Sequence, residues 1–148
     1  YEEAMAVMPV LITFIPMLMG TGGNCGSQRS TLVIRGLAAG EIQFKDIFRA
    51  IFKEIRVAFV VSILLALVNG IRIYIMYGQN ITLAIALGIT MMAVVVMAKC
   101  IGCTLPLLAK KLGLDPAIMA APLITTILDT CTILVYFNIV TAIFHLNA

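Results

Sequence analysis

Four long segments that are almost free of charge dominate this chain of 148 residues. They cover approximately residues 5–35, 53–77, 81–109 and 116–145, and the few charged residues within them lie mostly near their ends. A helix needs about 20 mostly apolar residues to cross a bilayer, so each segment is long enough to span one. Only 11% of the residues are charged, whereas soluble domains carry about 25%. The sequence therefore predicts an all-α, polytopic membrane protein, a helical bundle whose residues 1–148 form one transmembrane domain.

The charges of the three connections differ. The first connection carries the basic residues Arg35, Lys45, Arg49, Lys53 and Arg56, the third carries Lys110 and Lys111, and the second, residues 77–80, carries none. Basic connections face the cytoplasm in membrane proteins. We therefore expect a multi-pass protein of the cell (inner) membrane, with both basic connections inside and the C-terminus outside. The net charge of +3 is small, so a nucleic-acid partner is not expected.

Residues 41–52, inside the first connection, show helical spacing of apolar residues with charges on the other face. The apolar members are Phe44, Ile47, Phe48, Ile51 and Phe52. Two interpretations are equally open, namely a short amphipathic helix that lies at the cytoplasmic interface and an ordinary helical loop.

Prolines and a tight turn predict breaks in the helices. Pro9 and Pro16 predict kinks in the first helix and Pro106 one near the end of the third, because proline lacks a backbone donor. Between the third and fourth helices, Gly113 can end one helix, Asp115 can cap the next, and Pro116 suits its first position.

A glycine-rich run, Gly20–Gln28, lies inside the first apolar segment. Four glycines in seven residues disfavour a helix by about 1 kcal/mol each relative to alanine. The polar residues Thr21, Asn24, Ser27 and Gln28 share the run. Non-helical backbone at membrane depth is tolerated only where it is buried in protein or lines a wet cavity. The run predicts a broken helix on the path of a small polar solute or an ion.

Asp129 is the only acidic residue deep in the predicted spans. A charged side chain there costs at least about 2.5–3.5 kcal/mol, which marks it as a functional candidate. Thr125 and Thr126 precede it by four and three residues and therefore share its helix face. Oxygen ligands favour Mg²⁺ or Ca²⁺. A single carboxylate suits an ion that keeps most of its water, or a symmetric dimer that supplies two.

Lys99 supports a different interpretation of Asp129. The two residues lie at similar predicted depth, so they can form a buried ion pair with a purely structural role. If Asp129 instead binds a cation, Lys99 must point elsewhere or be neutral.

Other candidate sites are weaker. Cys100 and Cys103 have the C-x-x-C spacing, but no further ligand stands near them, and we interpret all four cysteines as small packing residues. Arg29 is expected to extend toward the inner face, Arg72 to anchor the outer end, and His145 to lie at the outer interface. No nucleophile–base pair or nucleotide motif is present, so no enzyme is predicted.

The motifs together resemble the transmembrane domain of the MgtE magnesium channels. Residues 14–28 and 31–38 resemble the second family helix, residues 105–117 the fourth helix and its following turn, and residues 122–129 and 134–137 the fifth. The resemblance covers almost the whole chain, and the combination of the glycine run with the proline-to-aspartate run is specific.

The resemblance implies a homodimer in the lipid bilayer with five helices per subunit, a pore at the dimer axis, and Mg²⁺ as the transported ion bound there. The first family helix is then expected before Tyr1, together with upstream cytoplasmic regulatory domains. It also implies that Asp129 binds hydrated Mg²⁺, assisted by Thr125, Thr126 and Asn24. The predicted lining of the pore is completed by Gly20, Thr21, Gly22, Gly23 and Gln28.

The predicted function is a Mg²⁺-selective channel domain that passes largely hydrated divalent cations down their electrochemical gradient. A membrane potential of 100 mV contributes about 4.6 kcal/mol for a divalent ion. Two alternatives remain at this point: a Na⁺- or H⁺-coupled divalent-cation transporter with Asp129 as the coupling carboxylate, and a non-conducting scaffold in which Lys99 and Asp129 pair.

Overall fold

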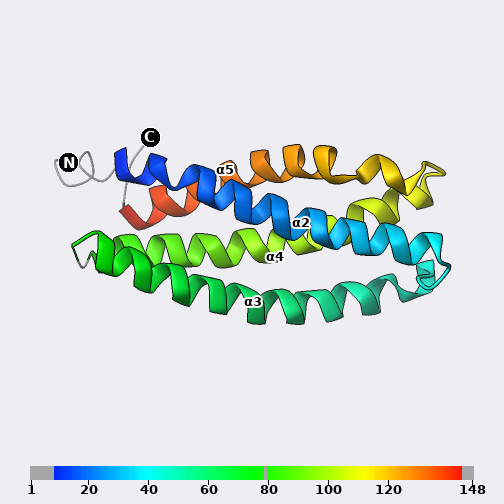
Figure 1. Cartoon of the computed structure of the whole chain (residues 1–148), viewed down its shortest axis with the longest axis horizontal. Coiled ribbons are helices and arrows are strands. Elements are labelled where there is room, and N and C mark those ends of the chain that lie inside the picture. Colours follow the sequence, from blue (N-terminus) through cyan, green and yellow to red (C-terminus); the bar gives the residue numbers. More distant parts are fainter. Residues whose placement is uncertain (1–8, 79, 145–148) are drawn as a thin grey trace.

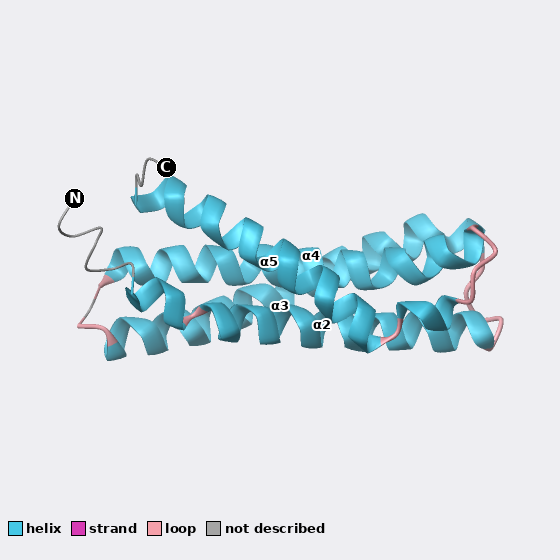
Figure 2. Cartoon of the chain, turned by 90° about the horizontal axis from the view of Figure 1, so that it is seen from above, coloured by secondary structure: helices cyan, strands magenta, loops and turns pink. Residues whose placement is uncertain are grey.

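The computed structural model describes residues 9–78 and 80–144, and this part of the chain consists of helices joined by short turns and loops, without strands. Four long helices, α2 (Ile15–Ala38), α3 (Ile47–Met76), α4 (Ile81–Lys111) and α5 (Ala121–Phe144), lie side by side in an elongated bundle (Figure 1 and Figure 2). Two short 3₁₀ helices, η1 (Phe44–Asp46) and η2 (Pro116–Met119), lie in the basic connections. The all-α prediction is thus confirmed for the described residues.

Helix α4 is the centre of the bundle, because it packs against α2, α3 and α5, while α2 also packs against α5. The main core lies among these helices and includes Leu18, Leu87, Met91 and Tyr136. Both basic connections lie at one end of the bundle, and the uncharged connection lies at the other (Figure 1). We call these the basic end and the neutral end.

Two of the predicted membrane spans are supported by length and composition. Helices α4 and α5 are long and apolar enough to cross a membrane, with mean hydropathies of 2.5 and 1.9 in their most apolar windows. Glycines and polar residues dilute the apolar character of α2, and α3 carries charged residues in its first three turns. For residues 5–35 and 53–77, membrane crossing stays a prediction.

The start of the last long helix differs from the prediction. Gly113 adopts a φ of 75° beyond the end of α4, and the Asp115 carboxylate accepts a hydrogen bond from the Ala117 N–H at 2.9 Å. The predicted turn chemistry is therefore present, but it caps η2 rather than a long helix. Helix α5 begins only at Ala121, and residue 145, where the fourth predicted span ended, lies outside the described residues together with the interfacial position expected for His145.

The amphipathic segment is not a separate interfacial helix. Its first part forms η1, and its second part forms the opening turns of α3. Ile47 and Ile51 pack inward against the cluster of Val33 and Leu37, whereas Phe48 is 87% exposed. The spacing of apolar residues correctly indicated a helix, but this helix is the start of α3, because the same inward face extends along it.

The predicted proline breaks have different outcomes. Helical residues 9–13, which begin at Pro9, are separated from α2 by a turn at Phe14, and Pro16 occupies the first turn of α2. The interruption expected at Pro16 is therefore present. Helix α4 continues through Pro106 to Lys111, and a kink at Pro106 stays a prediction.

The glycine run does not break its helix, contrary to the sequence prediction. Helix α2 is continuous through Gly20–Gln28 because three of its glycines are buried against neighbouring helices. A Cβ at Gly22 would lie 2.9 Å from Val94 of α4, and one at Gly26 would overlap the Leu128 side chain of α5. On the opposing helix, a Cβ at Gly102 would lie only 2.5 Å from the Gly26 carbonyl oxygen. The glycines thus serve close helix packing, which offsets their poor helix propensity.

Gly102→Ala is expected to lower the thermal stability of the purified protein in detergent, because the new methyl group meets backbone that cannot rotate away. Overpacking of this kind costs about 1–3 kcal/mol. Gly20→Ala is the matched control, since a Cβ there meets nothing within 4 Å and alanine favours a helix by about 1 kcal/mol. Equal melting temperatures for the two variants would contradict the close-packing role.

Candidate functional site

Asp129 lies in the third turn of α5, eight residues after Ala121, or about 12 Å along the helix axis. The carboxylate is therefore nearer the basic end of α5 than a helix starting at residue 116 would have placed it. It is partly exposed and lies against α2, where a Cβ at Gly23 would be 3.9 Å from Asp129 Oδ1 and 3.3 Å from Thr125 Cγ2. The absent side chain of Gly23 thus lets Asp129 and Thr125 approach the α2 backbone.

The hydroxyls of Thr125, Thr126 and Thr130, which lie near Asp129 on α5, donate to the backbone of their own helix. Thr125 Oγ1 donates to the carbonyl oxygens of Ala121 and Pro122, Thr126 Oγ1 to that of Pro122 at 2.9 Å, and Thr130 Oγ1 to that of Thr126 at 3.2 Å. A hydroxyl that donates its only proton still has oxygen lone pairs that accept. These hydroxyls therefore present acceptors, which suit a cation or its water shell.

The predicted lining residues of α2 divide into two groups. Gly20, Asn24 and Gln28 are exposed, whereas Gly22 and Gly23 are buried between helices. Thr21 is half-buried and donates to the Met17 carbonyl oxygen at 2.9 Å. Asn24 and Gln28 are one turn apart, so the amides share a face of α2.

Within the described residues, no group of three or more His, Cys, Asp or Glu side chains is placed to hold a metal ion. All four cysteines are free thiols, and Cys103 is buried. The C-x-x-C spacing therefore does not build a metal cluster in this part of the chain. Asp129 with its neighbouring oxygens offers too few ligands to replace the water shell of Mg²⁺, which dehydrates reluctantly.

Lys99 does not pair with Asp129. Its ammonium lies 3.4 Å from Glu54 Oε1, and Arg29 Nε lies 3.0 Å from Glu54 Oε2, with the Glu54 side chain only 8% exposed. We call Arg29, Glu54 and Lys99 the charge triad, and it joins α2, α3 and α4. The Lys99–Asp129 pair considered from the sequence is not formed, and Arg29 is engaged inside the bundle instead of extending to the inner face.

Glu54 was missed by sequence reasoning, which placed it at the edge of the second span. A signal for its burial was nevertheless present. Ile47, Ile51, Glu54, Ala58 and Ser62 follow helical spacing, and the structure places the last three of them in the buried face of α3. Small residues beside an acid on an inward helix face indicate that a neighbouring helix approaches and brings a partner.

The charge triad engages the basic residues that could otherwise pair with Asp129. Both basic residues that lie well inside the bundle are bound to Glu54, and neither of the two ion pairs in the described residues involves Asp129. An unpaired carboxylate with hydroxyl acceptors beside it can attract a cation. If Asp129 were paired with Lys99, its charge would be neutralised and it could not attract a cation.

Comparison with known proteins gives a consistent result. Residues 15–139 match the family model MgtE, described as divalent cation transporter. The chain is 36% identical to the magnesium transporter MgtE of Bacillus subtilis over 149 residues, covering 98% of this chain and 32% of that protein. It is 32% identical to the protein of the same name from Thermus thermophilus over 139 residues, covering 94% and 30%. The corresponding protein of Enterococcus faecalis is 33% identical over 142 residues. The chain spans about a third of the length of the curated relatives it matches.

Glu54→Gln is expected to lower the free energy of unfolding by about 3 kcal/mol, because it leaves two largely buried positive charges, whose side chains are 21% and 18% exposed, without a partner. Thermal or denaturant unfolding in detergent measures the effect. Glu41→Gln removes the same charge from an exposed position outside the long helices and is expected to change stability little. A triad without structural importance would give the two variants equal stability.

Proposed function

The chain belongs to the MgtE family of divalent cation transporters, and on that premise we propose that it forms the transmembrane part of a pathway for Mg²⁺. The observation that carries the proposal is the separation of charges inside the bundle. Arg29 and Lys99 are held by Glu54, which leaves the Asp129 carboxylate available to a cation.

Asp129 attracts Mg²⁺ as a largely hydrated ion in this proposal. The carboxylate accepts hydrogen bonds from the ion's water shell, and Thr125, Thr126 and Asn24 offer further oxygen acceptors to the same waters. Retaining the shell avoids the large cost of dehydration, which a site with a single carboxylate cannot repay. Gly20, Thr21 and Gln28 line the path beside Asn24, while Gly22 and Gly23 keep α2 close to α5.

A second copy of the chain completes the site in this proposal. Asn24, Gln28 and Thr126 are exposed in the described part of the chain, and polar side chains that face lipid are costly. A two-fold axis beside α2 and α5 would cover these residues with their own counterparts. It would also bring two Asp129 carboxylates to one ion, which matches the divalent charge.

The basic end faces the cytoplasm in the proposed orientation, because basic connections stay inside. The membrane potential then drives Mg²⁺ inward, and no nucleotide site is required for transport. A channel needs no coupling ion, whereas a coupled transporter would use Asp129 to bind Na⁺ or H⁺ during each cycle.

Asp129→Asn is expected to reduce Mg²⁺ flux into proteoliposomes by roughly tenfold or more. A hydrogen bond to a charged group contributes about 1.5–3 kcal/mol, and about 1.4 kcal/mol corresponds to a factor of ten. Flux is measured with a Mg²⁺-sensitive dye at equal amounts of folded protein, under a potential imposed without gradients of Na⁺ or H⁺.

Asp46→Asn is the matched control, because it removes an exposed carboxylate at the basic end, far along the chain from α5. It is expected to retain wild-type flux. Unchanged flux in a folded Asp129→Asn protein would refute the proposed site. Wild-type flux that appears only with a Na⁺ or H⁺ gradient would replace the channel by a coupled transporter.

A further inference from the structure

The outer face of α3 joins a row of basic residues to a long apolar stripe. Arg49, Lys53 and Arg56 are exposed and lie at positions i, i+4 and i+7, on one side of the helix. The same side continues toward the neutral end through exposed apolar residues, namely Val60, Leu64, Leu67, Ile71 and Ile75. We call this side of the helix the α3 outer face.

No carboxylate of the described residues forms an ion pair with the three basic residues of the α3 outer face. Both ion pairs in the described residues use Glu54, which points to the opposite, buried side of α3. A hollow of about 780 Å³ lies along this part of the helix and is lined by Lys53, Arg56, Val57 and Val60, among others. The hollow is thus positively charged at one end and apolar at the other.

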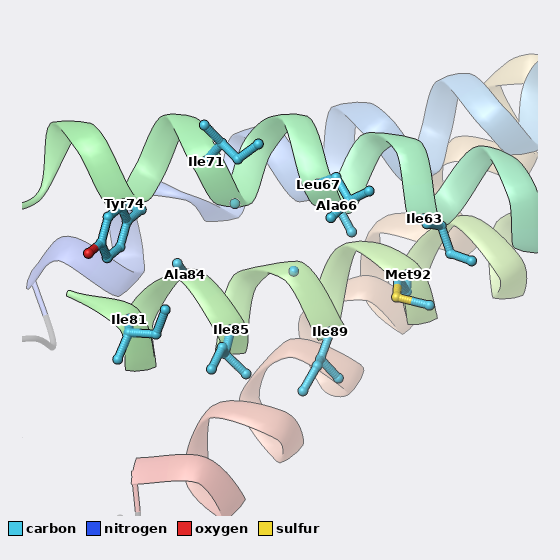
Figure 3. A pocket seen from close by; sticks show the side chains of 12 residues that line it. Ile63, Ala66, Leu67, Ile71, Tyr74, Ile81, Ala84, Ile85, Ile89 and Met92 are labelled. Atoms are coloured by element: carbon cyan, nitrogen blue, oxygen red, sulfur yellow. The ribbon is translucent and has the colours of Figure 1, made fainter. Parts of the chain in front are cut away.

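The apolar part of the face leads into a groove between α3 and α4. The groove has a volume of about 510 Å³ and is lined by Ile63, Leu67 and Ile71 of α3 and by Ile85 and Ile89 of α4 (Figure 3). Gly70 and Gly88 are also part of its lining. Leu67 and Ile71 belong both to the groove and to the α3 outer face.

From this arrangement we propose that the α3 outer face binds an anionic phospholipid. The phosphate lies against Arg49, Lys53 and Arg56, and one acyl chain follows Val60 and Leu64 into the mouth of the groove. The dimensions agree, because Leu67 lies eleven residues beyond Arg56, about 16 Å along the helix. Half of the hydrocarbon core, which is the reach of one leaflet's acyl chains, is about 15 Å.

Charge complementarity favours this occupant over the alternatives. A second copy of the chain would bring the same three positive charges toward its own or leave them covered without partners. The other basic connection is less suited to an anion, because Lys110 shares its smaller hollow, about 220 Å³, with the Asp115 carboxylate. Near a membrane surface each basic residue contributes about fivefold to the binding of anionic lipid.

Native mass spectrometry of the purified protein, titrated with phosphatidylglycerol or phosphatidylcholine, tests the proposal. We expect preferential binding of phosphatidylglycerol and a loss of affinity of roughly 100-fold in R49Q/K53Q/R56Q. The matched control K45Q/K110Q/K111Q removes three exposed basic residues from the same end and is expected to keep the preference. Glycerophosphoglycerol, the headgroup without acyl chains, is expected not to displace the bound lipid.

Four results would overturn the proposal. Equal binding of the two lipids would exclude recognition of the headgroup charge. Equal losses of phosphatidylglycerol affinity in the two triple variants would show that the preference depends on the total charge of the protein and not on these three residues. Displacement of the lipid by glycerophosphoglycerol would remove the role of the apolar groove. Disulfide cross-linking of a Val60→Cys variant between copies, without lipid binding, would assign the face to a second subunit.

Discussion

The contact between Gly26 of α2 and Gly102 of α4 sets the distance between the two helices on which the rest of the bundle depends. With a side chain at either position the backbones could not approach to the observed distance. The same close approach brings Arg29, one turn beyond Gly26, to Glu54 and beside Lys99 of α4. On the adjoining side of α2, Gly23 gives the Asp129 carboxylate its position against the helix. Small residues on one helix thus organise both the charge triad and the candidate ion site.

Segregation of charge within the bundle follows from that packing. Glu54 is buried and holds two positive charges, while Asp129 is partly exposed and holds none among the described residues. Two carboxylates at comparable distance from the basic end therefore have different roles. One neutralises charges that must be buried, and the other remains open to a mobile cation. The acceptor character of the threonine hydroxyls beside Asp129 reinforces the difference, because their protons are already used by the backbone.

The long helices and their order were predictable from the sequence, because long apolar runs in a chain with so few charged residues favour long helices over other secondary structure. Asp129 and its threonines were predictable for the same reason, since an acid in an apolar helix is conspicuous. The continuity of α2 was not, because helix propensity treats each glycine alone, whereas packing against Val94, Leu128 and Gly102 outweighs that cost. The partner of Lys99 was also missed, since depth along a helix says nothing about which way a side chain points. The start of α5 was misplaced because Asp115 caps whichever helix follows, including a 3₁₀ turn.

The charge triad contains two bases and one acid, so substitutions at its three positions have unequal effects. If either Arg29 or Lys99 is replaced by a neutral residue, the remaining pair is balanced. If Glu54 is replaced, two like charges face each other across the α2–α4 contact. In evolution, either base can therefore be replaced while the other still pairs with Glu54. The single acid has no substitute elsewhere in the triad. Substitution is thus tolerated at either basic position of the triad, but not at Glu54 of α3.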